Sequence, residues 1–204
     1  LLSHPRIMTF GEDETADVRV VDLDSSGPNV SFALEHQGQR AELVLSIAGS
    51  HNALNAAGAV CTLLGLGFEF FQTCAAVTKF AGTERRFQLH GECSGVKVYD
   101  DFAHHPTEVA AALKGARAVV GSGRLITVFQ PHLYSRTRIF AQEFAQALAL
   151  SDQVVITDVY AAREDPEPGV TGATISTRFE DDSKVHYVEK WEDTPAKAAS
   201  LAGP

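Results

Sequence analysis

The sequence has 204 residues, a formal net charge of −9 and 45% hydrophobic residues, which allows one large domain or two small ones. This acidic balance argues against a general nucleic-acid surface, and no apolar run approaches the roughly 20 residues of a membrane span. The three cysteines lack C-x-x-C spacing, so neither a disulfide framework nor a zinc site is indicated. A reducing, cytoplasmic location fits this cysteine usage.

The first part of the chain is predicted to form a small antiparallel sheet followed by helices. Strand-like segments rich in β-branched and aromatic residues alternate with turns, at Ile7–Phe10, Val18–Val21, Ser31–Glu35 and Glu42–Ser46. Ala- and Leu-rich helices are predicted over Asn52–Leu66 and Glu69–Phe80. Gly82 follows and is expected to be a hinge, which divides the chain into domains 1–82 and 83–204.

After Gly82 strands and helices alternate, which is typical of a Rossmann-like α/β domain. The predicted strands are Arg86–His90, Val96–Tyr99, Leu125–Phe129, Val154–Thr157 and Lys184–Val188. The predicted helices are Pro106–Val120 and Ser135–Leu150, the second with a core stripe of Phe140, Phe144 and Leu148. The continuous apolar run Leu125–Phe129 predicts a parallel sheet covered on both faces.

The most informative segment is the turn that joins Val96–Tyr99 to the helix beginning at Pro106. It contains Asp100, Asp101, His104 and His105, and Pro106 and Glu108 suit the first turn of a helix. Ligands bind at this kind of edge in an open α/β sheet, so these groups are candidates for chemistry. The alternative is structural, with two hydrogen-bonded imidazoles and two capping carboxylates.

A second polar segment, Gln130–Arg138, follows the strand that ends at Phe129. Ser135 is a natural N-cap, which would place Arg136 and Arg138 in a first turn where the helix dipole disfavours cations. Arg136 is therefore a candidate clamp for a phosphate or carboxylate, with His132 beside it. The alternative is a solvated arginine pair facing Glu143.

Two further segments suit nucleotide binding. His51, Asn52 and Asn55 open the first helix, and the two carboxamides share a face and suit a base edge or a ribose. The alternative is that Ser50 caps this helix and the asparagines merely tolerate its start. Arg86 lies at the expected domain joint, which is a usual place for a ligand.

Taken together, these segments resemble the Mur ligases. The resemblance covers nearly the whole chain from Ile7 onward, and its most specific strings are DDFAHHPTE (Asp100–Glu108) and FQPHLYSRT (Phe129–Thr137), supported by HN-x-x-N, RRF and the DVY-containing segment Asp158–Pro166. Within the family, the motifs are most similar to those of the members that join L-alanine to UDP-N-acetylmuramate. The expected fold is the tail of a central ATPase domain followed by a Rossmann-like C-terminal ligase domain.

The resemblance implies an ATP-dependent, Mg²⁺-assisted ligase that forms an acyl phosphate and then an amide in peptidoglycan biosynthesis. His104 and His132 would face the acyl phosphate and the incoming alanine, and Arg136 would hold a carboxylate.

On the nucleotide side, the resemblance implies that His51, Asn52 and Asn55 meet the adenine side of ATP. Arg86 would meet ribose or phosphate, and Asp101 the ribose hydroxyls. No metal ligand is assigned to this chain.

The sequence also departs from the family pattern. Phe102 stands where tyrosine is common, and Leu133 where arginine is common. The family's GTHGKT-type phosphate loop and N-terminal UDP-sugar domain are not in this sequence. The polypeptide is therefore expected to be the later part of a longer enzyme and to be inactive alone.

Three alternative functions remain. A murein-peptide recycling ligase shares a DDFAHHPT-like turn but is not expected to carry FQPH-x-YSRT. A non-catalytic nucleotide-binding module is the second. The third is a metal-dependent hydrolase with Asp100, Asp101, His104 and His105 as ligands, which is disfavoured because adjacent histidines point apart.

Overall fold

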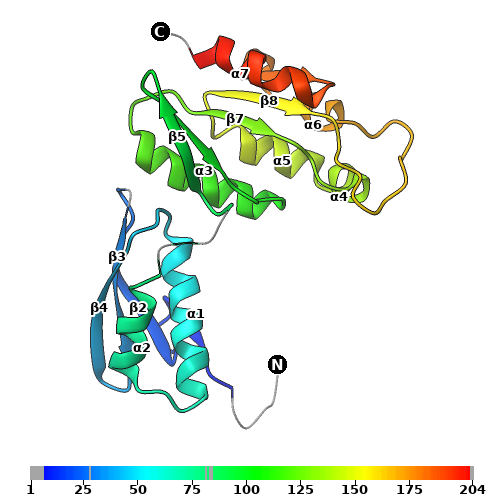
Figure 1. The fold of residues 1–204 in the computed structure, drawn as a ribbon. Coiled ribbons are helices and arrows are strands. Elements are labelled where there is room, and N and C mark those ends of the chain that lie inside the picture. Colours follow the sequence, from blue (N-terminus) through cyan, green and yellow to red (C-terminus); the bar gives the residue numbers. More distant parts are fainter. Residues whose placement is uncertain (1–6, 28, 81, 83–84, 203–204) are drawn as a thin grey trace. The chain divides into compact units, whose positions relative to one another are not determined.

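The computed structural model describes residues 7–27, 29–80, 82 and 85–202. The chain divides into two compact units (Figure 1), Leu1–Gln88 and Leu89–Pro204. Each unit has its own hydrophobic core. The division therefore lies a few residues after Gly82, the hinge expected from the sequence. None of the helices in the described part of the chain is long and apolar enough to cross a membrane.

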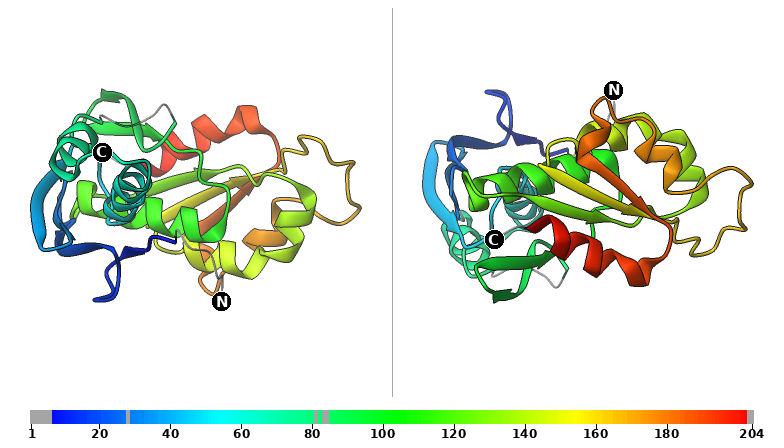
Figure 2. Two further views of the ribbon diagram at one scale, coloured as in Figure 1. Left: turned by 90° about the horizontal axis from the view of Figure 1, so that it is seen from below. Right: turned by 90° about the horizontal axis from the view of Figure 1, so that it is seen from above.

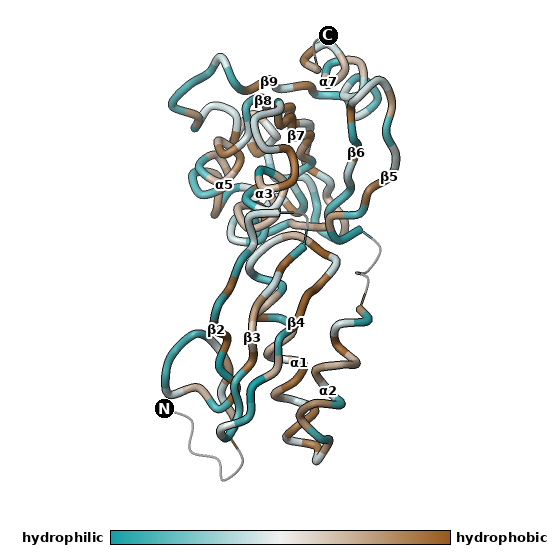
Figure 3. Tube along the Cα trace, turned by 90° about the vertical axis from the view of Figure 1, so that its left-hand side faces the viewer, coloured by the Kyte–Doolittle hydropathy of each residue, from teal (hydrophilic) through white to brown (hydrophobic). Residues whose placement is uncertain are grey.

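The first unit is a four-stranded sheet with two helices packed against it. The sheet has the order β1 (Phe10–Gly11), β2 (Val18–Asp24), β3 (Val30–His36), β4 (Gln39–Leu45), and the helices are α1 (His51–Gly65) and α2 (Phe70–Val77). Alternate residues of β3, among them Val30, Phe32 and Leu34, point into the core because successive side chains of a strand face opposite ways. Figure 3 shows hydrophobic residues along β3, β4 and α1.

The predicted antiparallel meander is correct for β2, β3 and β4 and wrong for the first strand. β1 is two residues long and pairs parallel to β2. The reason lies in the turn before β2, where the Asp17 carboxylate accepts hydrogen bonds from the Thr9 backbone N–H at 2.7 Å and its hydroxyl at 2.9 Å. These bonds hold the start of β2 beside Thr9, so the two segments run in the same direction.

The second unit contains a three-stranded parallel sheet, β7 (Ile126–Phe129), β8 (Gln153–Thr157) and β9 (Val185–Val188). Helix α7 (Thr194–Ala202) lies on one face of this sheet, and α3 (Pro106–Val120) and α5 (Ala141–Leu148) lie on the other (Figures 1 and 2). The remaining elements are β5 (Gln88–Cys93), β6 (Val96–Asp100), α4 (Tyr134–Ile139), α6 (Ala173–Ser176) and the 3₁₀ turns η1 (Asp182–Lys184) and η2 (Trp191–Asp193). The prediction of an α/β fold is confirmed.

Four details of this unit differ from the sequence predictions. β6 pairs with β5 in a separate two-stranded sheet across the turn Ser94–Gly95, so it is not a neighbour of β7. β7 is an edge strand of the parallel sheet, and 39% of Val128 is exposed although helices lie on both faces of the sheet. The predicted helix Ser135–Leu150 is two helices, broken at Phe140 (φ −108°, ψ 22°). α6 and α7 were not predicted.

Gly172 holds α6 against the end of β8, and its replacement should destabilise the second unit. A Cβ at this position would lie 2.2 Å from the Thr157 carbonyl oxygen, a backbone atom that cannot rotate away. We expect Gly172→Ala to lower the free energy of unfolding by about 1–3 kcal/mol, as for an overpacked core. Urea denaturation measures this loss. Gly91→Ala is the control because a Cβ there meets nothing within 4 Å, and equal stability of the two variants would contradict the prediction.

Candidate functional site

The two polar segments of the second unit meet at His104 and His132. Their ring centroids are 6.0 Å apart, with an interplanar angle of 67°. The strand that precedes His104, β6, belongs to a different sheet from β7, the strand that precedes His132. The two imidazoles meet because α3, which follows His104, packs against α5, which follows the His132 segment.

His104 is fixed by its own turn. Its Nδ1 lies 2.9 Å from the Phe102 carbonyl oxygen, and its backbone N–H donates to Glu108 Oε2 at 3.0 Å. A carbonyl oxygen can only accept, so Nδ1 carries the hydrogen and Nε2 is the acceptor of the neutral ring. The Phe102 ring packs edge-on to His104 at 5.1 Å. His104 is thus an oriented imidazole with its basic nitrogen on the far side from Phe102 O.

The neighbouring His105 has a structural role. Its Nδ1 accepts a hydrogen bond from the Thr107 backbone N–H at 3.3 Å, which caps α3. Its ring also packs edge-on to Phe140 at 5.0 Å. His105 therefore points away from His104, and the described residues contain no group of three or more His, Cys, Asp or Glu side chains arranged to hold a metal ion. This geometry does not support the metal-hydrolase alternative.

The neutral His132 ring is in the opposite tautomer to that of His104. Its Nδ1 lies 3.3 Å from Arg136 Nη1, and a guanidinium only donates, so Nδ1 accepts and the neutral ring carries its hydrogen on Nε2. The ring stacks on Tyr160 at 5.8 Å. Together, the two histidines offer one acceptor nitrogen and one N–H donor.

Burial is the main cause that lowers the pKa of His132, and the charges of Arg136, His104 and Arg163 lower it further. We therefore expect NMR titration of the chain to give His132 a pKa below its ordinary value of 6.5. Arg136→Leu should raise this pKa because it removes a neighbouring positive charge, whereas Arg138→Leu should not. A pKa above 6.5 would contradict the assignment of His132 as a neutral acceptor.

Arg136 is not held at a capped helix N-terminus in the way the sequence suggested. The residue that caps α4 is Leu133, at φ 74°, and Ser135 lies inside the helix. Because α4 has only six residues, Arg136 is also in its last turn, so the dipole argument for an anion site does not apply. Arg138 pairs with Glu167 at 2.8 Å and not with Glu143. Arg136 remains a candidate because it contacts His132.

Asp101 belongs to the second unit, and Asn52 and Asn55 belong to the first. The Asp101 carboxylate accepts from the Ala103 backbone N–H at 2.7 Å, which closes the turn before His104. Asn52 Nδ2 donates to the Ala48 carbonyl at 2.7 Å, and Asn55 Nδ2 donates to Asn52 Oδ1 at 3.4 Å, so the two carboxamides do share a face. Ser50 occupies the N-cap position of α1 without a side-chain hydrogen bond to the helix.

Residues with positive φ angles lie close in sequence to His51 and Arg86. A Cβ on Gly49 (φ 100°) would lie 2.5 Å from His51 Cε1, so the imidazole folds over a residue that must be glycine. Arg86 lies between Arg85 (φ 58°) and Phe87 (φ 48°), in a turn where the Arg85 N–H donates to Gln88 Oε1. These residues belong to the first unit as the chain divides.

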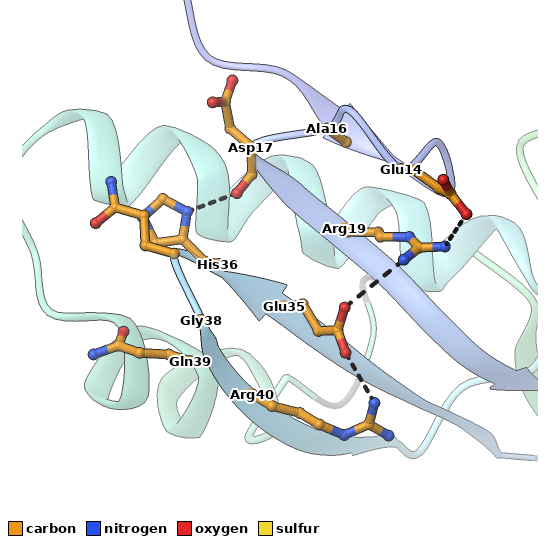
Figure 4. Close-up of a pocket in the computed structure, with 10 residues that line it drawn as sticks. Glu14, Ala16, Asp17, Arg19, Glu35, His36, Gly38, Gln39 and Arg40 are labelled. Atoms are coloured by element: carbon orange, nitrogen blue, oxygen red, sulfur yellow. Dashed lines mark hydrogen bonds and ion pairs between the residues drawn. The ribbon is translucent and has the colours of Figure 1, made fainter.

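A hollow of about 340 Å³ in the first unit is lined by none of the sequence-predicted site residues. Arg19, Glu35 and Arg40 meet there in ion pairs, and the His36 imidazole contacts the Asp17 carbonyl (Figure 4). Exposed ion pairs of this kind contribute little to stability. The Arg19, Glu35 and Arg40 side chains of this hollow are paired with one another and exposed to solvent. They do not offer the acceptor nitrogen and N–H donor that His104 and His132 provide.

Comparison with known proteins identifies the family. The domain family described as Mur ligase, glutamate ligase domain matches residues 85–204, more than half of the chain. The chain belongs to the Mur ligase family. The matched region contains His104, His132 and Arg136, so the histidine pair lies inside the family domain.

The relatives agree with this assignment. The UDP-N-acetylmuramate–L-alanine ligase of Clavibacter sepedonicus is 52% identical over 198 residues, which is 97% of this chain and 41% of that protein. The crystal structure of UDP-N-acetylmuramate–alanine ligase MurC from Thermotoga maritima matches with a TM-score of 0.74 and 28% identity, over 93% of this chain and 41% of that one. A murein peptide ligase from Psychrobacter arcticus shares the fold, with a TM-score of 0.67 and 24% identity, over 95% of this chain and 40% of that one. This Mur ligase chain thus spans less than half the length of these relatives.

Sequence reasoning missed two residues of the site, Tyr160 and Glu164. Tyr160 stacks on His132, and Glu164 accepts a hydrogen bond from the Ser135 backbone N–H at 2.9 Å. Their segment was part of the family resemblance, but nothing in its local spacing shows that it returns to the end of β7. The available signal was its position directly after β8, the strand adjacent to β7.

Proposed function

We propose that the protein containing this chain joins L-alanine to UDP-N-acetylmuramate in peptidoglycan biosynthesis, with ATP as the second substrate. The observation that carries this proposal is the pairing of His104 with His132 at 6.0 Å, with Arg136 in contact with His132. These residues lie in the two segments that most resemble the alanine-adding members. The relatives named for this activity, including the Clavibacter sepedonicus enzyme at 52% identity, support the choice of substrate.

The proposed reaction has two steps. The γ-phosphate of ATP passes to the muramoyl carboxylate, which gives an acyl phosphate and ADP. The amine of L-alanine then attacks the acyl carbon, the C–O bond to phosphate breaks, and the amine loses a proton. His104 offers an acceptor nitrogen for that proton, and His132 offers an N–H to the departing phosphate oxygen. Arg136 would hold a carboxylate through charge-assisted hydrogen bonds.

For the nucleotide, we propose contacts from His51, Asn52 and Asn55 to the adenine side and from Arg86 to ribose or phosphate. Asp101 would accept from the ribose hydroxyls. These assignments match residues 1–82 to the end of a central ATP-binding domain and 83–204 to a C-terminal ligase domain. Mg²⁺ would neutralise the phosphates, but the described residues offer no cluster of three ligands for it, so we assign no step to the metal on this chain.

A chimeric enzyme tests this function directly. The chain replaces the matching 41% of the Clavibacter sepedonicus ligase, to which it is 52% identical. We expect ATP-dependent formation of UDP-N-acetylmuramoyl-L-alanine. A chimera that folds but uses a murein peptide in place of L-alanine would favour the recycling ligase. One that binds ATP without ligating either acceptor would favour a non-catalytic module.

The isolated 204-residue polypeptide should bind ATP poorly and form no product. Its sequence lacks the glycine-rich GTHGKT-type loop, whose backbone N–H groups would hold the phosphates. Calorimetry with ATP and Mg²⁺ should therefore show little heat. The complete Clavibacter sepedonicus ligase is the positive control. A micromolar dissociation constant, or product from the polypeptide alone, would contradict this prediction.

A further inference from the structure

The backbone of the loop after β8 forms hydrogen bonds to the residues on both sides of His132. The Leu133 N–H donates to the Tyr160 carbonyl at 3.0 Å, and the Tyr160 N–H donates to the Pro131 carbonyl at 2.8 Å. These two hydrogen bonds flank His132, which forms an isolated parallel bridge with Tyr160. The Tyr160 ring stacks on the His132 ring with an interplanar angle of 29°. His132 is therefore held through both its backbone and its ring.

The same loop also holds the start of α4. The Glu164 carboxylate accepts from the Ser135 backbone N–H at 2.9 Å with one oxygen and from the Ser135 hydroxyl with the other. An N–H in the first turn of a helix has no partner within the helix, so this carboxylate supplies one. The hydrogen bonds from Ser135 lower the pKa of Glu164, which keeps the carboxylate charged at neutral pH. Ser135 directly precedes Arg136, so the contact fixes the residue beside the candidate cation.

The backbone between the two contacts is strained. Leu133 has φ 74°, a conformation that L-residues other than glycine rarely adopt, although its side chain is buried. Its carbonyl accepts from both the Thr137 N–H at 3.1 Å and the Thr137 hydroxyl at 2.8 Å. Strain of this type persists only where surrounding contacts impose it, and it clusters at functional sites. The contacts of Tyr160 and Glu164 are the ones that impose it here.

We propose that Tyr160 and Glu164 are positioning residues for the amide-forming step, which hold His132 and Arg136 in the orientation that receives the acyl phosphate and the amino acid. This inference rests on the proposed function for the identity of the substrates. The orientation itself is a property of the chain and can be measured without substrate. Neither residue is proposed to touch the reacting atoms.

The first test is NMR of the full chain at a pH above the pKa of His132, with the ring nitrogens assigned by a His132→Asn variant. In the wild type, Nδ1 should have the shift of an acceptor nitrogen and Nε2 that of a protonated one. In Glu164→Ala, the two shifts should move toward each other because Arg136 no longer selects one tautomer. Glu164→Gln should restore the wild-type shifts because its carbonyl oxygen still accepts from the Ser135 N–H.

The matched control is Glu167→Ala. Glu167 lies in the same acidic loop and contacts the same helix, but through Arg138. It should leave the His132 shifts unchanged. If Glu164→Ala and Glu167→Ala both leave them unchanged, the positioning role is wrong. If Glu164→Ala does not fold, Ser135→Ala removes only the hydroxyl donor and should move the shifts in the same direction, and unchanged shifts there would equally overturn the proposal.

The second test is kinetic and uses the chimera. Glu164→Ala should lower kcat/KM for L-alanine by up to about 100-fold, the scale expected when a reacting group is displaced by about 1 Å. The KM for ATP should not change, and Glu164→Gln should recover most of the loss. If the wild-type chimera makes no product, the proposed function fails while the NMR result still decides the positioning role. If the chimera is active and Glu164→Ala matches it in kcat/KM, the positioning role fails alone.

Discussion

Phe144→Ala is expected to lower the free energy of unfolding of the second unit by about 3–5 kcal/mol, the range for truncating a buried phenylalanine. Phe144 is 1% exposed, and its ring lies 5.2 Å from that of Phe129. Truncation would remove this contact and leave a cavity between α5 and β7, because packed interiors collapse only partly around a lost ring.

Trp191 makes this measurement specific to one unit. It is the only tryptophan of the chain and lies in the second unit. Urea denaturation followed by its fluorescence should therefore report the loss. Ile139→Ala is the control, since Ile139 is an apolar residue of α4 that is 57% exposed, and it should change stability by about 0.5 kcal/mol or less. A loss below about 1 kcal/mol for Phe144→Ala would show that this core does not stabilise the unit as described.

Arg136→Ala should cause the largest loss of activity with little loss of stability. A lost hydrogen bond to a charged group is worth about 1.5–3 kcal/mol, which corresponds to a fall of roughly 10- to 150-fold in kcat/KM. In the chimera, this fall should appear when L-alanine or UDP-N-acetylmuramate is varied at saturating ATP. The measurement distinguishes which carboxylate the guanidinium holds.

Arg138→Ala is the matched control for this experiment. Arg138 lies two residues away in the same short helix, is more than half exposed, and pairs with Glu167. Arg138→Ala should leave kcat/KM for L-alanine and kcat/KM for UDP-N-acetylmuramate within about twofold of the values without the substitution, as expected for an exposed ion pair. If Arg136→Ala leaves kcat/KM unchanged for both substrates, Arg136 does not hold a substrate carboxylate.

The sequence predicted correctly the bounds of an element whose two ends carry strong local signals. Helix α3 has the predicted bounds, because Pro106 fits its first position and Gly121, at φ 58°, ends it. The break at Phe140 was not predictable from periodicity, since Phe140, Phe144 and Leu148 keep a helical spacing across it. Likewise, Ser135 is a better N-cap than Leu133 by residue type, yet Leu133, whose N–H donates to the Tyr160 carbonyl, occupies the N-cap position.

The sequence marked His104, His132 and Arg136 as candidates, but it did not mark Tyr160 or Glu164, which contact the same segment. The titratable groups near His104 and His132 marked both segments, but the sequence could not show that β6 leaves the main sheet. It also could not show that Glu164, 29 residues from Ser135, would be its hydrogen-bond partner. Pairings between distant residues depend on the register of whole elements, which local patterns do not specify.

The separation of β6 from β7 determines how the distance between the two imidazoles is maintained. No hydrogen-bonded ladder of the described strands joins the backbone that carries His104 to the backbone that carries His132. The connection runs instead through the packing of α3 on α5 and of the His105 ring on Phe140. Side chains packed between helices can slide by small amounts without breaking backbone hydrogen bonds. The distance between the two imidazoles therefore depends on how α3 packs on α5, and on the size of the side chains between these helices.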